Sequence, residues 1–409
     1  MNSSRRRFLA QLAGGSAVVS FGGRVPAFLS EAASAELSGS KDTILVVVQL
    51  TGGNDGLNTI VPYNNDEYRK ARPKLAIPAD DVLKIDDMLG LHPSARGLAD
   101  LLEDGKLAVV QGVGYPNPNR SHFESMDVWH TCHRKGSPRT TGWLGRFLDD
   151  ANGFAGVDAP AVHVGSEKQP LALTADDVRV PSFESPESLR LEDGGDQQLR
   201  DAIRALDNRS SSATDPLLGF LQSSTTSAMA ASKRIAEALR DYQTPVTYPE
   251  SELASRLKTV AQLIDAGLKT RIYYVELDGF DTHSQQAAAH GILIQQLGGA
   301  VRAFVEDVAH HGHGDRTLVM SFSEFGRRVA ENASEGTDHG AAAPMFLAGS
   351  RVRAGLVGEH PSLTDLDNGD LKFHTDFRQV YATLLEHWLG GTSSTILGDQ
   401  FKSIDVLRT

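Results

Sequence analysis

VVVQLTGGNDGLN, residues 46–58, combines a β-branched apolar run with an abrupt glycine-rich turn that carries one acid, Asp55. A short apolar run of this kind predicts a central strand of a parallel sheet. Ligands of such sheets bind beyond the carboxyl ends of the strands. Gly52 and Gly53 allow a sharp turn and a close approach of the backbone to a ligand. We therefore expect Asp55 and the neighbouring Asn54 to lie at an active site, although a plain strand-to-loop turn has the same pattern.

The amino terminus has the pattern of an export signal. SRRRFL, residues 4–9, precedes a weakly apolar segment and the small-residue run Ala33-Ser34-Ala35. A basic start, a short apolar region and a small-residue cleavage site define a signal peptide, and the paired arginines specify the twin-arginine route. We expect the twin-arginine translocase to export the chain and residues 1–35 to be removed, leaving residues 36–409 in the periplasm or outside the cell. The alternative is a retained membrane anchor or a fortuitous basic start.

The composition is that of an acidic globular protein. The chain has 40 basic and 52 acidic side chains and a net charge of −12. Such a chain lacks the basic surface that nucleic-acid backbones require, so nucleic acid is not an expected partner. No apolar run outside the signal is long enough to span a bilayer, so the mature chain is not expected to be an integral membrane protein. Cys132 is the only cysteine, which rules out an intrachain disulfide.

Strand and helix patterns alternate along the chain. Residues 98–102 predict a helix before a second strand at 107–114, and residues 272–277 and 317–322 predict further strands. Strand, helix, strand is the unit of a parallel sheet. From about 176 to 250 the chain becomes charged and then rich in Ser, Thr and Ala, which predicts a helical insertion or cap. The length of the mature chain suits one elaborated α/β domain or two, and we expect one.

The turn after the second predicted strand carries a candidate nucleophile. In PNPNRSHFESMD, residues 116–127, the chain turns and then opens into a predicted helix at Ser121. A hydroxyl at a helix amino terminus is close to backbone N–H groups that favour an anion or a developing alkoxide. Arg120 is a candidate for binding an anionic group, and Asn119 or His122 for holding a substrate oxygen. The alternative for Ser121 is an ordinary N-cap.

Three later clusters carry acids beside predicted strands, and two of them also carry a histidine. Their members are Asp278, Asp281, His283, Glu324, Asp338 and His339. Divalent ions require oxygen and nitrogen ligands that rigid elements hold in place, so these clusters predict a metal site. Acids also favour loops and helix caps, which is the alternative.

Seven blocks of the chain resemble recurrent blocks of a largely uncharacterised family of exported proteins, domain-of-unknown-function family 1501. The blocks are QLTGGNDGLNT, NPNRSHFESMD, GWLGR, ELDGFDTH, SEFGR, GTDHG and DFRQVYATLL. This family is placed in the alkaline phosphatase-like superfamily, with sulfatases and cofactor-independent phosphoglycerate mutases. The resemblance implies a three-layer α/β/α fold with a mostly parallel central sheet. It also implies two divalent ions, zinc or manganese first, with magnesium or calcium as alternatives.

The resemblance assigns a role to each matching residue. The implied nucleophile is Ser121, and the implied metal ligands are Asp55 after the first strand, Asp278 or Asp281 with His283, Glu324, and His339 as the last histidine. One position departs from the superfamily pattern, because Phe325 follows Glu324 where the superfamily has a histidine. The second ion would therefore lack its usual imidazole unless Asp338 or His122 substitutes.

These features predict a metal-dependent hydrolase or transferase that acts on phosphate or sulfate esters with a serine nucleophile. Its substrate would be an anionic ester. No sequence typical of a formylglycine-type sulfatase occurs. The alternative is a non-catalytic descendant of the same fold that binds a surface glycan, a lipid or a partner protein.

Overall fold

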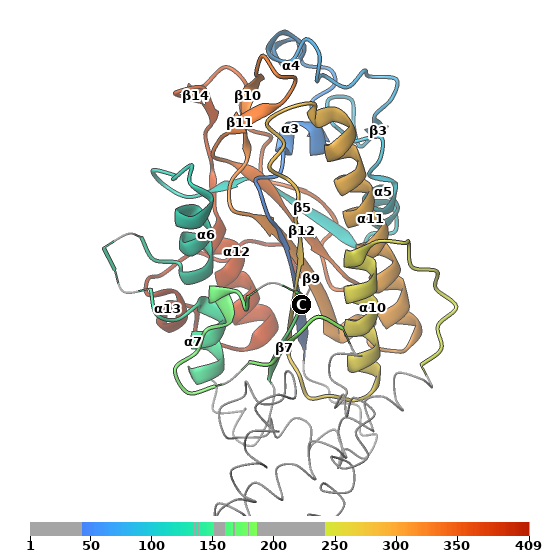
Figure 1. Cartoon of the computed structure of the whole chain (residues 1–409), viewed down its shortest axis with the longest axis vertical. Helices are drawn as coiled ribbons and strands as arrows, with labels where there is room; N and C mark the ends of the chain where they lie inside the picture. The colour runs from blue at the N-terminus through green and yellow to red at the C-terminus, as the bar shows by residue number, and fades with distance from the viewer. Residues whose placement is uncertain are drawn as a thin grey trace, which may run out of the picture.

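The computed structural model describes most of the chain after residue 42 (Figure 1). The described residues are 43–134, 136–137, 139–150, 160–166, 168–178, 180–185 and 242–408. The predicted signal peptide at 1–35 lies outside them, as does most of the predicted insertion, at 186–241. Within the described ranges, no helix has both the length and the apolarity needed to cross a bilayer.

A nine-stranded sheet runs through the described part of the molecule. Its strands, in spatial order, are β13 (Gly355–Val357), β5 (Leu107–Gly114), β12 (Ala343–Ala348), β9 (Thr317–Ser323), β1 (Ile44–Leu50), β8 (Ile272–Leu277), β6 (Ala161–Val164) and β7 (Ser182–Phe183), with β16 (Thr375–Asp376) also paired to β5. Neighbouring strands are parallel except for β12, which runs antiparallel to both β5 and β9. The prediction of a mostly parallel central sheet is confirmed.

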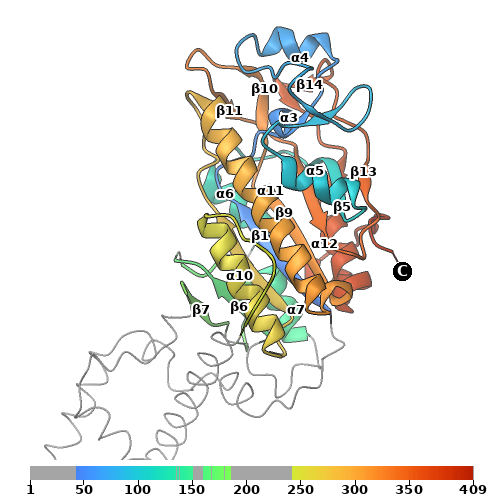
Figure 2. The same cartoon turned by 90° about the vertical axis from the view of Figure 1, so that its right-hand side faces the viewer.

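Helices cover both faces of this sheet (Figures 1 and 2). The helices on one face are α5 (Arg96–Glu103), α10 (Glu252–Asp265) and α11 (Gln286–His310), and those on the other are α6 (His122–Thr131), α7 (Trp143–Asp150), α12 (Phe377–Leu384) and α13 (Ser393–Leu397). β1 contributes side chains to the hydrophobic cores on both faces of the sheet, because successive side chains of a strand point to opposite faces. Val46 and Val48 pack in the first hydrophobic core, whereas Leu45 and Val47 pack in the second. The three-layer α/β/α arrangement is therefore confirmed.

Short elements surround one end of the sheet (Figure 1). They are α3 (Gly56–Thr59), β2 (Ile60–Val61), α4 (Asp66–Ala71), β3 (Leu83–Lys84), β4 (Gly90–Leu91), β10 (Arg327–Glu331), β11 (Thr337–His339), β14 (Leu366–Asp367) and β15 (Asp370–Leu371). β10 pairs with β11 in an antiparallel ribbon. A small hydrophobic core beneath these elements includes Leu57, Tyr68 and Val329.

The sheet directions bring distant loops to this same end. β1, β5, β8 and β9 are mutually parallel, so the loops that follow them all leave the sheet at its carboxyl edge. Because β12 returns antiparallel beside β9, the connection at residues 324–342 also stays at that edge. The predicted site residues from all five clusters therefore lie at one end of the molecule.

Candidate metal centre

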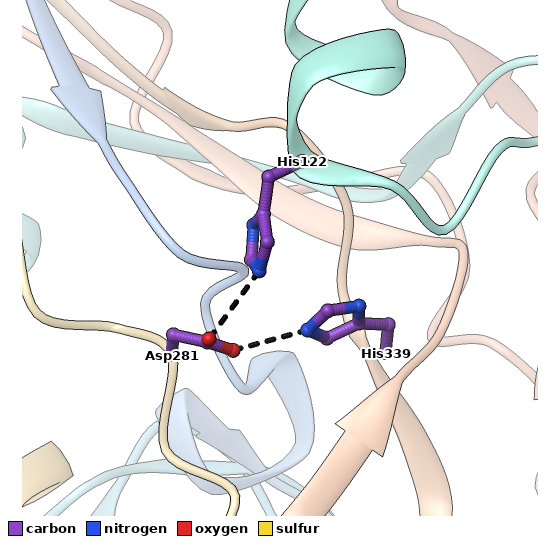
Figure 3. Close-up of side chains that lie close together, drawn as sticks. All are labelled: His122, Asp281 and His339. Atoms are coloured by element: carbon purple, nitrogen blue, oxygen red, sulfur yellow. Dashed lines mark hydrogen bonds and ion pairs between the residues drawn. The ribbon is translucent and has the colours of Figure 1, made fainter.

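Four side chains from three loops converge at the carboxyl edge of the sheet. His122 begins α6, Asp281 and His283 lie between β8 and α11, and His339 ends β11. Figure 3 shows the imidazoles of His122 and His339 pointing at the Asp281 carboxylate. The Nε2 atoms of His283 and His339 are each 3.0 Å from Asp281 Oδ1 and 2.9 Å from one another. His122 Nε2 is 3.4 Å from Asp281 Oδ2.

The second nitrogen of two imidazoles is held by an oxygen that only accepts hydrogen bonds. His339 Nδ1 lies 2.7 Å from the backbone carbonyl oxygen of Arg120, and His122 Nδ1 lies 2.8 Å from Glu324 Oε1. A carbonyl or carboxylate oxygen requires a proton on the nitrogen that faces it. In a neutral ring, Nε2 then carries a lone pair. Both Nε2 atoms are thus oriented as metal ligands, in the way that outer partners usually fix ligating histidines.

The Nε2 lone pairs of His122 and His339 point at the Asp281 carboxylate. This arrangement is unfavourable unless positive charge lies between the nitrogens and the carboxylate. The third imidazole repeats the pattern, since His283 Nδ1 faces Asp338 Oδ1 at 3.5 Å. Extra protons or a metal ion would supply that charge. The Nε2 atoms of His283 and His339 and Asp281 Oδ1 are separated by 2.9–3.0 Å, and His122 Nε2 lies 3.4 Å from the other oxygen of the same carboxylate. Such spacings suit ligands about 2 Å from a divalent ion. The side chains of Asp281 and His283 are 48% and 43% exposed, which leaves the cluster open to a substrate.

The electrostatic surroundings keep the carboxylate of this cluster ionised. Burial raises the pKa of Asp281, but in the metal-free protein a hydrogen bond from a protonated His339 ring and one from Arg327 outweigh burial and hold that pKa at about 2. The hydrogen bond to the fully buried Glu324 raises the pKa of His122 above its usual value, although partial burial opposes the shift. A metal ion at this position would compete with a proton for the His122 ring, so its binding would strengthen as the pH rises.

Comparison with known proteins places the chain in a family. Residues 42–390 match a family model described as "Protein of unknown function (DUF1501)". The chain belongs to this family. Among curated proteins, none matches the chain.

The DUF1501 chain also has loose structural similarity to solved proteins. It is similar to the PsFucS1 sulfatase from Pseudoalteromonas sp. (TM-score 0.40, 11% identity, 92% of this chain and 74% of that one). It is similar to the lipoteichoic acid synthase LtaP from Listeria monocytogenes (TM-score 0.39, 9% identity, 92% and 80%). A third similar structure is an alkaline phosphatase superfamily protein from Vibrio parahaemolyticus (TM-score 0.39, 7% identity, 92% and 77%). Similarities this low transfer neither a substrate nor a mechanism.

Asp55 of the DUF1501 chain lies apart from the cluster, in a buried ion pair. Arg72 Nη1 is 2.6 Å from Asp55 Oδ2, both side chains are fully buried, and Gln286 donates to the same oxygen. Asp55 Oδ1 accepts from the backbone of Asn58 and so begins α3. Burial raises the pKa of Asp55, but the Arg72 guanidinium outweighs this and lowers it below its usual value. Because both oxygens already have partners, these contacts give no support to the expected ligand role of Asp55.

Three other expected site residues occupy structural positions. Asn54 is fully buried, so it has no access to a substrate. Asp278 is exposed, and its carboxylate accepts from the backbone N–H of the next residue. Asn119 accepts from the backbone N–H of Ser121 at 2.8 Å, which shapes the turn before α6.

The candidate nucleophile and its neighbour lie beside the cluster. Ser121 occupies the N-cap position of α6, yet its exposed hydroxyl makes no capping hydrogen bond. It directly precedes His122 and follows the Arg120 carbonyl that holds His339. The Arg120 guanidinium pairs with Asp370 through Nε at 3.0 Å and also through Nη2, and its side chain remains 41% exposed.

Glu324 and Phe325 support the cluster from below. Glu324 contacts His122, as described, and is a partner of one candidate ligand. The Phe325 ring is fully buried, with its centroid 5.0 Å from that of His122 and 4.6 Å from that of His339. Phenylalanine has no lone pair, so the position where the resemblance implies a second imidazole forms an apolar floor. Among the described residues, His122, Asp281 and His339 form a group of three potential ligands whose donor atoms all lie within 4.8 Å of one another.

Sequence reasoning missed two buried arginines. Arg72 is fully buried against Asp55, and Arg327 is 1% exposed and donates to Asp281 at 2.8 Å. A lone arginine in a sequence predicts a solvated side chain. Arg327 belongs to SEFGR, one of the blocks that resemble the family, so the sequence pointed to its segment. No motif near Arg72 pointed to that residue.

Proposed function

We propose that this protein is a metal-dependent hydrolase or transferase of phosphate or sulfate esters with one divalent ion at its centre. The ion would be held by Asp281 Oδ and by the Nε2 atoms of His122, His283 and His339. The observation that carries the proposal is the approach of these three nitrogens to the Asp281 carboxylate, with each Nδ1 atom facing an accepting oxygen.

The donor set also bears on the identity of the ion. Imidazole nitrogens suit zinc and other transition ions, whereas magnesium and calcium prefer sites built from oxygen. Three imidazoles and one carboxylate therefore favour zinc, with manganese as the second choice. This donor set narrows the expected metal to zinc or manganese. It also replaces the two ions that the resemblance implies by one ion.

The chain's own residues supply the remaining chemistry. When bound, the ion would polarise the ester oxygen of the substrate. Ser121 Oγ would attack the phosphorus or sulfur atom, the leaving alcohol would depart with a proton, and water would then hydrolyse the seryl ester. The amino terminus of α6 places backbone N–H groups beside the developing negative charge. Arg120 would bind a substrate oxygen with the exposed part of its guanidinium.

Ser121→Ala is expected to lower the turnover of aryl phosphate or sulfate esters more than about a thousandfold, because the variant lacks the attacking oxygen. The measurement is steady-state turnover of both ester classes by the zinc-loaded protein. Ser284→Ala, an exposed serine beside His283, is the control and should keep full activity. Activity that survives in Ser121→Ala with metal content unchanged would exclude Ser121 as the nucleophile.

The location of the protein belongs to the same proposal. The twin-arginine pattern at residues 4–9 supports export by the translocase and action in the periplasm or outside the cell. Fractionation of cells that express the chain tests this, with the triple variant Arg5→Lys, Arg6→Lys and Arg7→Lys expected to stay inside.

A second candidate is a non-catalytic binding protein of the same fold. The closed Asp55–Arg72 pair and the apolar Phe325 floor favour it, because both remove parts of the implied two-ion machinery. A pure binder of glycan, lipid or protein should hold its ligand equally well after His339→Ala. A zinc-loaded protein that turns over neither ester class would favour this candidate.

A further inference from the structure

We infer that Arg327 is a positioning residue for the metal centre, acting with Glu324 through the double-glycine turn after β1. The inference rests on the proposed metal site and goes beyond it, because neither residue needs to touch the ion. Glu324 directly follows β9 and Arg327 begins β10, so both lie in the SEFGR segment. Glu324 contacts a ligand imidazole, and Arg327 contacts the ligand carboxylate.

Arg327 joins the loops that carry the ligands. Its side chain is buried, and among the described residues the only carboxylate it pairs with is that of Asp281, at 2.8 Å from Nη2 to Oδ1. Its other acceptors are the carbonyl oxygens of Gly52, Gly53 (2.8 Å), Phe280 (2.9 Å) and Thr337 (2.8 Å). These oxygens belong to the loops after β1 and β8 and to β11, which ends at His339. One guanidinium therefore fixes three loops relative to one another.

Glu324 holds the same turn from its other side. Its carboxylate accepts from Gly52 N at 2.9 Å and Gly53 N at 3.3 Å, while Arg327 takes the carbonyl oxygens of both glycines. The two peptides are thus clamped between a carboxylate and a guanidinium. The same Glu324 oxygen that binds Gly52 lies 2.8 Å from His122 Nδ1.

Only glycine fits between these groups. Gly52 and Gly53 have φ angles of +118° and +86°, a region that favours residues without a Cβ. A Cβ at Gly52 would lie 2.4 Å from the backbone nitrogen of Asp281, and one at Gly53 would lie 2.4 Å from Phe325 Cε2. The close approach lets Glu324 and Arg327 act on one rigid turn.

The consequence is a ligand set that is spaced before the ion arrives. Glu324 orients the His122 ring and Arg327 orients the Asp281 carboxylate, and both are tied to the same two peptides. Outer partners of metal ligands typically contribute a factor of roughly 10 to 100 to metal affinity. Lysine at position 327 would keep the charge, but its single ammonium group does not reproduce a fork of donors to four carbonyls and a carboxylate.

Arg72 provides a matched control. It is as deeply buried as Arg327, it pairs with a single aspartate, and it also donates to backbone carbonyls, at Arg328 and Val329. Its partner is Asp55, which has no contact with the cluster. Arg72→Lys therefore reports the cost of disturbing a buried guanidinium in this part of the fold without disturbing a ligand.

The test is the zinc dissociation constant of the full chain, measured by competition with a chromophoric chelator. Arg327→Lys is expected to weaken zinc binding roughly 10- to 100-fold, whereas Arg72→Lys leaves it unchanged. Thermal unfolding without metal shows whether the two variants lose comparable stability. Should Arg327→Lys fail to fold, Glu324→Gln takes its place, because the amide carries only one oxygen for three donors, and the same weakening is expected.

The outcomes separate this inference from the proposed function. Equal zinc affinities for wild type, Arg327→Lys and Glu324→Gln overturn the positioning role while leaving the metal site intact. Equal losses in Arg327→Lys and Arg72→Lys overturn it as well, because they indicate a general loss of structure. A wild-type chain that binds no zinc removes the proposed site itself.

Discussion

His339→Ala is expected to abolish tight zinc binding. His339 Nε2 faces both Asp281 Oδ1 and His283 Nε2, and the ring centroid of His339 also lies 4.4 Å from that of His122, so His339 contacts every other member of the cluster. Loss of a ligand should weaken binding by more than the roughly 10- to 100-fold caused by loss of an outer partner. Equilibrium competition with a chelator, at one fixed pH for both proteins, measures the change.

His310→Ala is the matched control for this prediction. His310 is exposed at the carboxyl end of the 25-residue helix α11, and the other end of this helix follows the loop of His283. Its removal should leave zinc affinity and ester turnover intact. If His339→Ala binds zinc as tightly as the wild type, the assignment of the cluster as a metal centre is incorrect.

Asp55→Ala is expected to destabilise the protein strongly without emptying the metal site. The substitution leaves the Arg72 guanidinium buried without its carboxylate, and such a break costs about 3–5 kcal/mol of unfolding free energy. Urea unfolding of the metal-free protein measures the loss. Asp278→Ala, which removes an exposed acid from the loop after β8, should change stability little.

The ion pair between Asp55 and Arg72 also predicts that stability depends on pH in the acid range. The pKa of Asp55 is lower in the folded chain than in the unfolded chain, so its contribution is present above the unfolded value of about 3.9. That contribution is lost as the pH falls through the lowered folded value. Asp55→Ala should remove this part of the acid unfolding curve. A folded Asp55→Ala protein that has lost its zinc would restore Asp55 as a ligand.

The sheet could be predicted because its main strands are short apolar runs in the sequence. The apolar run at 107–114 became β5 with the same bounds, and the opening run became the fully buried β1. The direction of β12 could not be predicted, because its apolar sequence suits a parallel or an antiparallel neighbour. That direction places His339, which precedes β12, at the same edge as residues that follow β5 and β8.

The site was predictable in its residue types and less so in their roles. Asp281, His283 and His339 were expected near one another and lie together. His122 was expected to hold a substrate oxygen, but its Nδ1 atom is fixed by Glu324, which is distant in sequence. Whether an acid binds a metal or an arginine depends on such long-range partners. Asp55 shows this most clearly, because nothing in GGNDG indicates that Arg72 lies against it.

The metal content of the purified wild-type chain tests the central claim most directly. We predict about one zinc ion per chain by elemental analysis after equilibration with zinc and removal of excess, and a higher melting temperature with zinc than with chelator. Asp55→Ala should retain that ion and His339→Ala should lose it. A wild-type chain that stays metal-free at micromolar zinc and neutral pH, with an unchanged melting temperature, would contradict the account.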